Sequence, residues 1–174
     1  MYPIVVDNFF EDPNSVRDYA LSLEYRQPNN EGWLGYRCFN RDETFAKILT
    51  NKIHELIPSS LDIDTFYYCF HYSLESTKQT SPYNFHDYKI HMDFCEFAGI
   101  IYLSPNPPLK MGTSFYSDDK KIINSIENNY NRLVYYPGKQ HHGPTDLFGT
   151  TKENGRLVLT FFSNMPPKGN LIKF

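Results

Sequence analysis

The last two thirds of the chain consist of short apolar segments separated by turn residues, and this alternation restricts the possible folds more than any other feature. The segments are rich in aromatic and β-branched residues, and they span 65–73, 90–92, 98–103, 113–116, 132–136 and 156–163. Residues of these types favour strands. The turn signals between them include Pro137-Gly138 and Asn154-Gly155, and an Asn-Gly pair favours a hairpin. We therefore expect a fold built mainly from short strands.

The first third of the chain carries the signals of two helices. Asp12 and Pro13 suit the N-cap and the first position of a helix, and apolar residues follow at helical spacing as far as Leu23. A second apolar stripe begins near Asp42 and ends shortly before Pro58. We also expect a polar loop over 74–88 and one short helix within 118–130.

Two helices followed by many strands predict a mainly β fold with N-terminal helices, in which the helices pack on a β-sandwich or jelly roll. The chain has 174 residues, enough for one domain with its own hydrophobic core. We expect a single domain over 1–174, with a helical part at about 1–60 and a β core at about 61–168.

Charge and cysteine content exclude several classes of protein. The net charge of −3 gives no basic surface, which argues against a nucleic-acid partner. The three cysteines are odd in number and widely spaced, so they form neither a disulfide framework nor a zinc motif, and a reducing, cytoplasmic location is expected. No signal peptide is visible at the N-terminus, and no apolar run is long enough to span a bilayer, so we expect no membrane partner.

The run Ile90-His91-Met92-Asp93 carries the chemistry that the sequence suggests. In a strand, residues two positions apart point to the same face, so the imidazole of His91 and the carboxylate of Asp93 can converge on one metal ion. A third ligand from the distant pair His141-His142 would complete a triad of two histidines and one carboxylate. Such a triad leaves three coordination positions open, which is what non-heme Fe(II) oxygenases need.

Arg156 opens the apolar segment 156–163. A single arginine at the start of such a strand is placed to reach into the interior of a barrel. Its planar guanidinium can pair with a carboxylate through two parallel hydrogen bonds. We expect a carboxylate-binding position beside the metal site.

In this order, the segments resemble the 2-oxoglutarate- and Fe(II)-dependent oxygenases, especially the prolyl-4-hydroxylase-like branch. The matching segments are 91–93, 98–104, 112–116, 131–137, the histidine pair with Phe148-Gly149, 156–162 and the opening at 7–13. The resemblance covers most of the chain. It implies a double-stranded β-helix, a jelly-roll or cupin-like core, flanked by helices.

The resemblance also implies an iron site made by His91, Asp93 and one residue of the histidine pair. We prefer His142, because related chains place the distal histidine a few residues after the strand-ending proline and a bulky residue before it, the role that His141 fills here. In the alternative, His141 is the ligand and His142 supports it. Fourteen positions separate His142 from Arg156, somewhat more than the family leads us to expect.

Arg156 resembles the residue that binds the far carboxylate of 2-oxoglutarate, and Tyr102, Tyr72 and Thr160 resemble polar groups that line the co-substrate pocket. The implied activity is that of a hydroxylase. It couples oxidative decarboxylation of 2-oxoglutarate by O2, giving succinate and CO2, with oxidation of a primary substrate. The implied cofactor is Fe(II), and the implied co-substrates are 2-oxoglutarate and O2.

The primary substrate is not determined by these residues, and a peptidyl residue and a small molecule are equally compatible with them. Loops like the one that holds Trp33 and Arg37 cap the active-site mouth in similar chains, so we expect both residues to contact the substrate. Two other functions stay open. One is a cupin-like metal enzyme that does not use 2-oxoglutarate, and the other is a non-catalytic jelly-roll binding or structural protein. The oligomeric state is also open.

Overall fold

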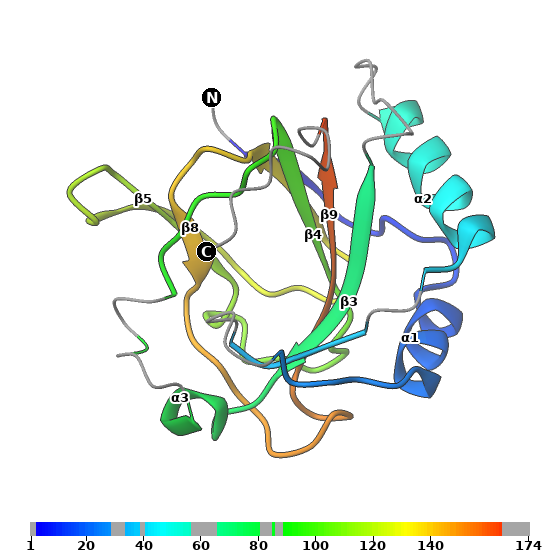
Figure 1. The fold of residues 1–174 in the computed structure, drawn as a ribbon, viewed down its shortest axis with the longest axis horizontal. Helices are drawn as coiled ribbons and strands as arrows, with labels where there is room; N and C mark the ends of the chain where they lie inside the picture. Colours follow the sequence, from blue (N-terminus) through cyan, green and yellow to red (C-terminus); the bar gives the residue numbers. More distant parts are fainter. Residues whose placement is uncertain are drawn as a thin grey trace.

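Two antiparallel β-sheets form the body of the molecule in the computed structural model (Figure 1), which describes residues 3–28, 34–38, 41–56, 66–80, 85 and 89–164. The larger sheet has the strand order β1-β7-β4-β9-β3-β2, and the smaller has the order β6-β5-β8. The strands are β1 (Ile4–Val6), β2 (Tyr36–Arg37), β3 (Tyr67–Ser73), β4 (Phe97–Tyr102), β5 (Thr113–Tyr116), β6 (Ile122–Ile126), β7 (Leu133–Pro137), β8 (His142–Pro144) and β9 (Arg156–Ser163).

Helices α1 (Pro13–Ser22) and α2 (Glu43–Leu56) lie against the outer face of the larger sheet, beside β3, and a third helix, α3 (Thr77–Thr80), forms one turn. The expected start of α1 is confirmed, because Asp12 accepts a hydrogen bond of 3.1 Å from the backbone N–H of Ser15. Asp42 caps α2 in the same way, through a bond of 2.9 Å from the N–H of Phe45. Two N-terminal helices on a jelly-roll core were therefore predicted correctly.

Side chains point alternately to the two faces of each central strand, so the larger sheet separates two hydrophobic cores. The outer core joins the helices to the larger sheet and includes Leu157, Leu159 and Phe161 of β9. The inner core lies between the sheets and includes Val158 of the same strand and Phe115 of β5. Because neighbouring residues of a strand point to opposite faces, the inward positions of β9 are every second residue counted from its first.

A glycine in β4 shapes the outer core. A Cβ atom added at Gly99 would lie 2.2 Å from the ring of Phe161, which is fully buried on β9. The register pairs these two residues directly. The missing side chain lets the aromatic ring lie across β4, so this glycine is required by packing rather than by a turn.

Two local expectations were wrong. The segment 118–130 forms no helix but a hairpin, in which β6 pairs with β5 after a turn that holds Lys120 at a φ of 59°. Residues 90–92 form no strand, because only His91 is paired, through an isolated antiparallel bridge to His142. Local composition is compatible with a helix or a hairpin at 118–130 and with a strand or a loop at 90–92. Pairing with distant residues decides which of these forms.

Candidate active site

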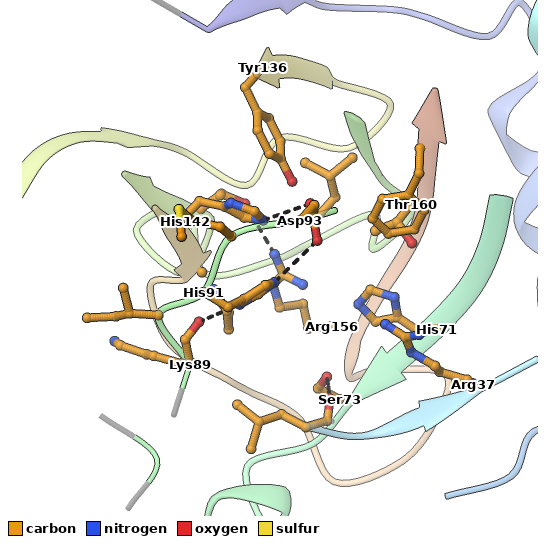
Figure 2. A pocket seen from close by; sticks show the side chains of 18 of the residues that line it. Arg37, His71, Ser73, Lys89, His91, Asp93, Tyr136, His142, Arg156 and Thr160 are labelled. Atoms are coloured by element: carbon orange, nitrogen blue, oxygen red, sulfur yellow. Dashed lines mark hydrogen bonds and ion pairs between the residues drawn. The ribbon is translucent and has the colours of Figure 1, made fainter. Parts of the chain in front are cut away.

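His91, Asp93 and His142 come together at one end of the inner core, and each offers one ligand atom within 4.8 Å of the others. The Nε2 atom of His142 lies 3.3 Å from Oδ2 of Asp93, and Nε2 of His91 lies 3.8 Å from Oδ1. Figure 2 shows the three side chains pointing toward one another. The structure thus brings the expected trio together from a loop and from strand β8.

Backbone hydrogen bonds fix the positions of these three residues. His91 and His142 exchange N–H···O bonds of 3.0 and 2.9 Å across their bridge. The backbone N–H of Asp93 donates to the carbonyl of Gly138 at 2.8 Å. The ligand pair is therefore held by bonds to the segment that contains the distal histidine, although 90–92 is not a strand.

Each histidine ring is oriented by a carbonyl two residues earlier in the chain. Nδ1 of His91 lies 3.0 Å from the carbonyl oxygen of Lys89, and Nδ1 of His142 lies 2.8 Å from that of Gln140. A carbonyl oxygen only accepts hydrogen bonds, so Nδ1 carries the proton in each ring. Nε2 of each ring then faces Asp93, which is the orientation that a metal-ligating histidine needs.

The electrostatics of the trio favour a bound cation. Burial, followed by the neighbouring His142, lowers the pKa of His91 to about 4, so this ring is neutral at physiological pH. Oδ2 of Asp93 is buried and accepts no hydrogen bond from any described residue. The Nε2 atoms of both histidines and the Asp93 carboxylate thus converge on one point, and a cation bound there would stabilise such a set of donors. Two histidines and one carboxylate are the donors of a non-heme Fe(II) site.

His141, the alternative distal ligand, points elsewhere. Its Nδ1 atom lies 3.5 Å from Oδ1 of the exposed Asp118, and it does not line the cavity around the trio. His142 is buried, and β8 places it opposite Phe115 of β5. His141 precedes β8 and lies outside the cavity lining, whereas His142 belongs to β8 and lines the cavity.

A cavity of about 530 Å³ opens beside the trio, between the two sheets. Its described lining combines the trio with basic, hydroxyl and apolar side chains: Leu34, Arg37, His71, Ser73, Lys89, Ile90, Met92, Phe94, Ile100, Thr113, Tyr136, Pro144, Arg156, Thr160 and Phe162, together with Gly143. The size is that of a small-molecule site.

Arg156 lies in this cavity and is itself buried. Its Nη2 atom donates weakly to the carbonyl of Gly112 at 3.3 Å and to the hydroxyl of Thr113 at 3.4 Å, while its buried Nε has no partner among the described residues. No described carboxylate forms an ion pair with it. A buried cation without a counter-charge is costly, so the carboxylate of a ligand would complete this position.

The longer run from His142 to Arg156 is taken up by a folded loop. The side chain of Asn154 accepts hydrogen bonds of 2.8 Å from the N–H groups of Thr150 and Thr151. Gly149 has a φ of 79°, and a Cβ there would lie 2.3 Å from the carbonyl oxygen of Asn154. The additional residues therefore form a turn of their own and do not displace Arg156.

The other expected pocket residues have three different positions. Thr160 lines the cavity, although its hydroxyl donates to the carbonyl of Cys69 at 3.2 Å. Tyr102 lies outside the cavity lining, where its ring is 5.6 Å from the guanidinium of Arg156 and its hydroxyl donates to Thr113 at 2.7 Å. Tyr72 is on the opposite face of β3, stacked on Tyr36 at 4.7 Å, so the expectation that it lines the pocket is corrected.

Of the two expected substrate contacts, Arg37 lines the cavity, and Trp33 lies outside the described residues. The lining residues that were not expected include Lys89, Thr113 and Tyr136. The ring of Tyr136 lies 4.6 Å from that of His142, and burial, followed by the charge of Asp93, raises the pKa of its hydroxyl well above the usual value. The sequence contains a signal for Tyr136, because residues two positions apart in a strand share a face, and Val134 and Tyr136 of β7 both face the inner core.

Comparisons with known proteins identify the fold. No protein-family model and no curated protein sequence matches the chain. Among solved structures, it is similar to a prolyl-4-hydroxylase from Pseudomonas putida, with 14% identity and a TM-score of 0.60 over 95% of this chain and 93% of that chain. A 2OG-Fe(II) oxygenase family oxidoreductase from Burkholderia pseudomallei gives 11% and 0.62 over 93% and 84%.

HygX from Streptomyces hygroscopicus, solved with nickel and 2-oxoglutarate bound, gives 11% identity and a TM-score of 0.57 over 94% of this chain and 82% of that chain. At such identities the likeness establishes the fold alone. The chain therefore has the jelly-roll fold of the 2OG-Fe(II) oxygenases, as expected from its sequence. Within the described residues, no helix is both long enough and apolar enough to cross a membrane.

Proposed function

We propose that this protein is an Fe(II)- and 2-oxoglutarate-dependent dioxygenase that acts as a hydroxylase. The observation that carries the proposal is the convergence of two Nε2 atoms and the unpartnered Oδ2 of Asp93 on one point of the cavity. His91, Asp93 and His142 would hold the iron. When bound, the iron supplies the activation of O2 that couples decarboxylation of 2-oxoglutarate to oxidation of the primary substrate.

The residues around the iron would bind and orient the co-substrate. Arg156 would pair with the far carboxylate of 2-oxoglutarate through its unpartnered Nε and its Nη2. The hydroxyl of Thr113 accepts from both Tyr102 and Arg156, so its own proton remains available for the same carboxylate. Tyr102 acts through Arg156, which it supports from outside the cavity. Thr160 would line the pocket.

The primary substrate is a small molecule or a peptidyl residue, and Arg37 is positioned to contact it. We assign the activity to a single domain spanning 1–174. A reducing, cytoplasmic location belongs to the same proposal and is supported by three buried cysteines, none of which forms a disulfide.

Anaerobic titration tests this function directly. Purified protein is given Fe(II) and then 2-oxoglutarate, and the weak visible metal-to-ligand charge-transfer band is recorded. We expect a band that requires both additions, and succinate on admission of O2. If Fe(II) binds but 2-oxoglutarate produces neither band nor succinate, the protein is a cupin-like metal enzyme of another kind. If no metal binds, it is a non-catalytic jelly-roll protein.

A further inference from the structure

The cavity has a second polar wall, formed by Arg37 of β2 and His71 of β3. The register pairs the two residues directly, and both line the cavity. The next pair along these strands, Tyr36 and Tyr72, stacks on the opposite face of the sheet. Residues directly opposite one another in an antiparallel pair share a face, so the register itself places Arg37 beside His71 on the inner side. Figure 2 shows the two side chains together, apart from the metal trio.

His71 has capacity for a ligand. Its Nδ1 atom is buried and has no hydrogen-bond partner among the described residues. Burial, then the charges of Arg37 and Arg156, lowers the pKa of this ring well below 6.5, so the ring is neutral and offers one N–H donor and one acceptor. A buried polar atom without a partner is unfavourable unless a ligand or water satisfies it.

Positive charge exceeds negative charge among the lining residues of this cavity that the structure describes. Among its described lining residues, three cations, Arg37, Lys89 and Arg156, face one carboxylate, that of Asp93. Lys89 has a structural role, because its Nζ atom donates to the carbonyl of Thr145 at 2.8 Å and lies 5.1 Å from the ring centroid of Phe85. Arg156 is assigned to 2-oxoglutarate. Arg37 is the third cation of this lining, and it lies in the pocket wall beside His71.

A second arginine pairs with Arg37 in the sheet but lies outside the cavity lining. An isolated antiparallel bridge sets the exposed Arg26 directly opposite Arg37 at the edge of the sheet. The rim of the cavity, by contrast, is apolar: Met92 and Phe94 line it and are 48% and 58% exposed.

We propose that the primary substrate is a small organic acid whose carboxylate binds at Arg37 and His71 while its apolar part lies against Met92, Phe94 and Phe162. This inference rests on the proposed function, because it treats the cavity as an oxygenase site with 2-oxoglutarate at Arg156. The planar guanidinium of Arg37 suits bidentate pairing with a carboxylate, and the cavity volume of about 530 Å³ suits a small molecule.

The test uses matched acids and amides as probes. Hexanoate, hexanamide, benzoate and phenyl phosphate are titrated calorimetrically into the protein loaded with Ni(II), with and without saturating 2-oxoglutarate. We expect hexanoate to bind about tenfold more tightly than hexanamide, the ratio for one charge-assisted hydrogen bond. Arg37→Gln should abolish this preference and leave 2-oxoglutarate affinity unchanged. Arg37→Lys, which keeps the charge, should retain part of it, and Lys47→Gln, on the exposed face of α2, should change neither.

Equal binding of hexanoate and hexanamide, or an acid preference that survives Arg37→Gln in a folded variant, overturns the proposal. Tighter binding of phenyl phosphate than of benzoate, dependent on Arg37, overturns the choice of a carboxylate and reassigns the site to phosphate esters. The 2-oxoglutarate titration of the wild-type protein is a separate readout. Its failure contradicts the proposed function, whereas the difference in acid preference between the wild-type protein and Arg37→Gln still reports on the Arg37 wall.

Discussion

His91 and His142 are oriented in the same way: each ring directs Nδ1 to the carbonyl oxygen two residues earlier and leaves Nε2 facing Asp93. The two rings lie 4.5 Å apart, and the bridge between their backbones holds them there. The proposed metal site is therefore preorganised by main-chain hydrogen bonds.

Removal of a proposed ligand should abolish metal binding without unfolding the protein. Loss of an outer-shell partner typically lowers metal affinity 10- to 100-fold, so we expect His142→Ala to lower Fe(II) affinity by at least about 100-fold. His141→Ala is the matched control and should leave the affinity unchanged, because its ring faces Asp118. Anaerobic Fe(II) titration of both variants measures this. Stronger loss in His141→Ala would reverse the assignment of the distal ligand.

Arg156→Gln should weaken 2-oxoglutarate binding and spare the metal. The substitution removes a buried charge and keeps an amide nitrogen that reaches only about as far as Nε of the arginine. A hydrogen bond to a charged group contributes about 1.5–3 kcal/mol, so we expect a loss of about 10- to 100-fold in 2-oxoglutarate affinity. Titration of the charge-transfer band gives both affinities. The exposed Lys110→Gln should behave as wild type. Unchanged 2-oxoglutarate affinity in Arg156→Gln would exclude this arginine from the co-substrate site.

Gly99→Ala should destabilise the fold through the outer core. The added methyl group would meet the ring of Phe161, and overpacking of this kind costs about 1–3 kcal/mol in the free energy of unfolding. Urea denaturation measures the change. Phe161→Leu alone also destabilises the protein, but in the double variant the cost of the alanine should fall, because the clashing ring is absent. Simple additivity of the two substitutions would show that they do not interact.

His71 should make stability depend on pH below neutrality. Its folded-state pKa is well below 6.5, because burial opposes the charged ring, whereas the unfolded chain takes up a proton near pH 6.5. The unfolded state therefore binds more protons as the pH falls below 6.5, and stability decreases there by up to about 1.4 kcal/mol per pH unit. Above that pH the residue adds no pH dependence.

Urea denaturation of the metal-free protein at pH 7.5, 6.5 and 5.5 measures this dependence. His71→Gln removes the titrating group and should flatten the decline between pH 6.5 and 5.5. A decline as steep in His71→Gln as in the wild-type protein would show that other groups cause it.

The sequence specifies those elements whose signals are local. The caps Asp12 and Asp42 predict where both helices begin, because a capping side chain bonds to a backbone N–H only a few residues away. The aromatic and β-branched segments predict the strands of the jelly roll. The residues His91, Asp93 and Arg156 could be named as a candidate site because their chemical types and order resemble those of a known family.

Pairing between distant residues decides what the sequence leaves open. The segment 118–130 is a hairpin because β5 provides a partner for it, and His142 rather than His141 faces Asp93 because of its place in β8 opposite Phe115. His71 and not Tyr72 lines the cavity for the same reason. Aromatic residues occur on both faces of strand β3, so its composition alone does not show which face lines the cavity, and its register with β2 and β9 determines this.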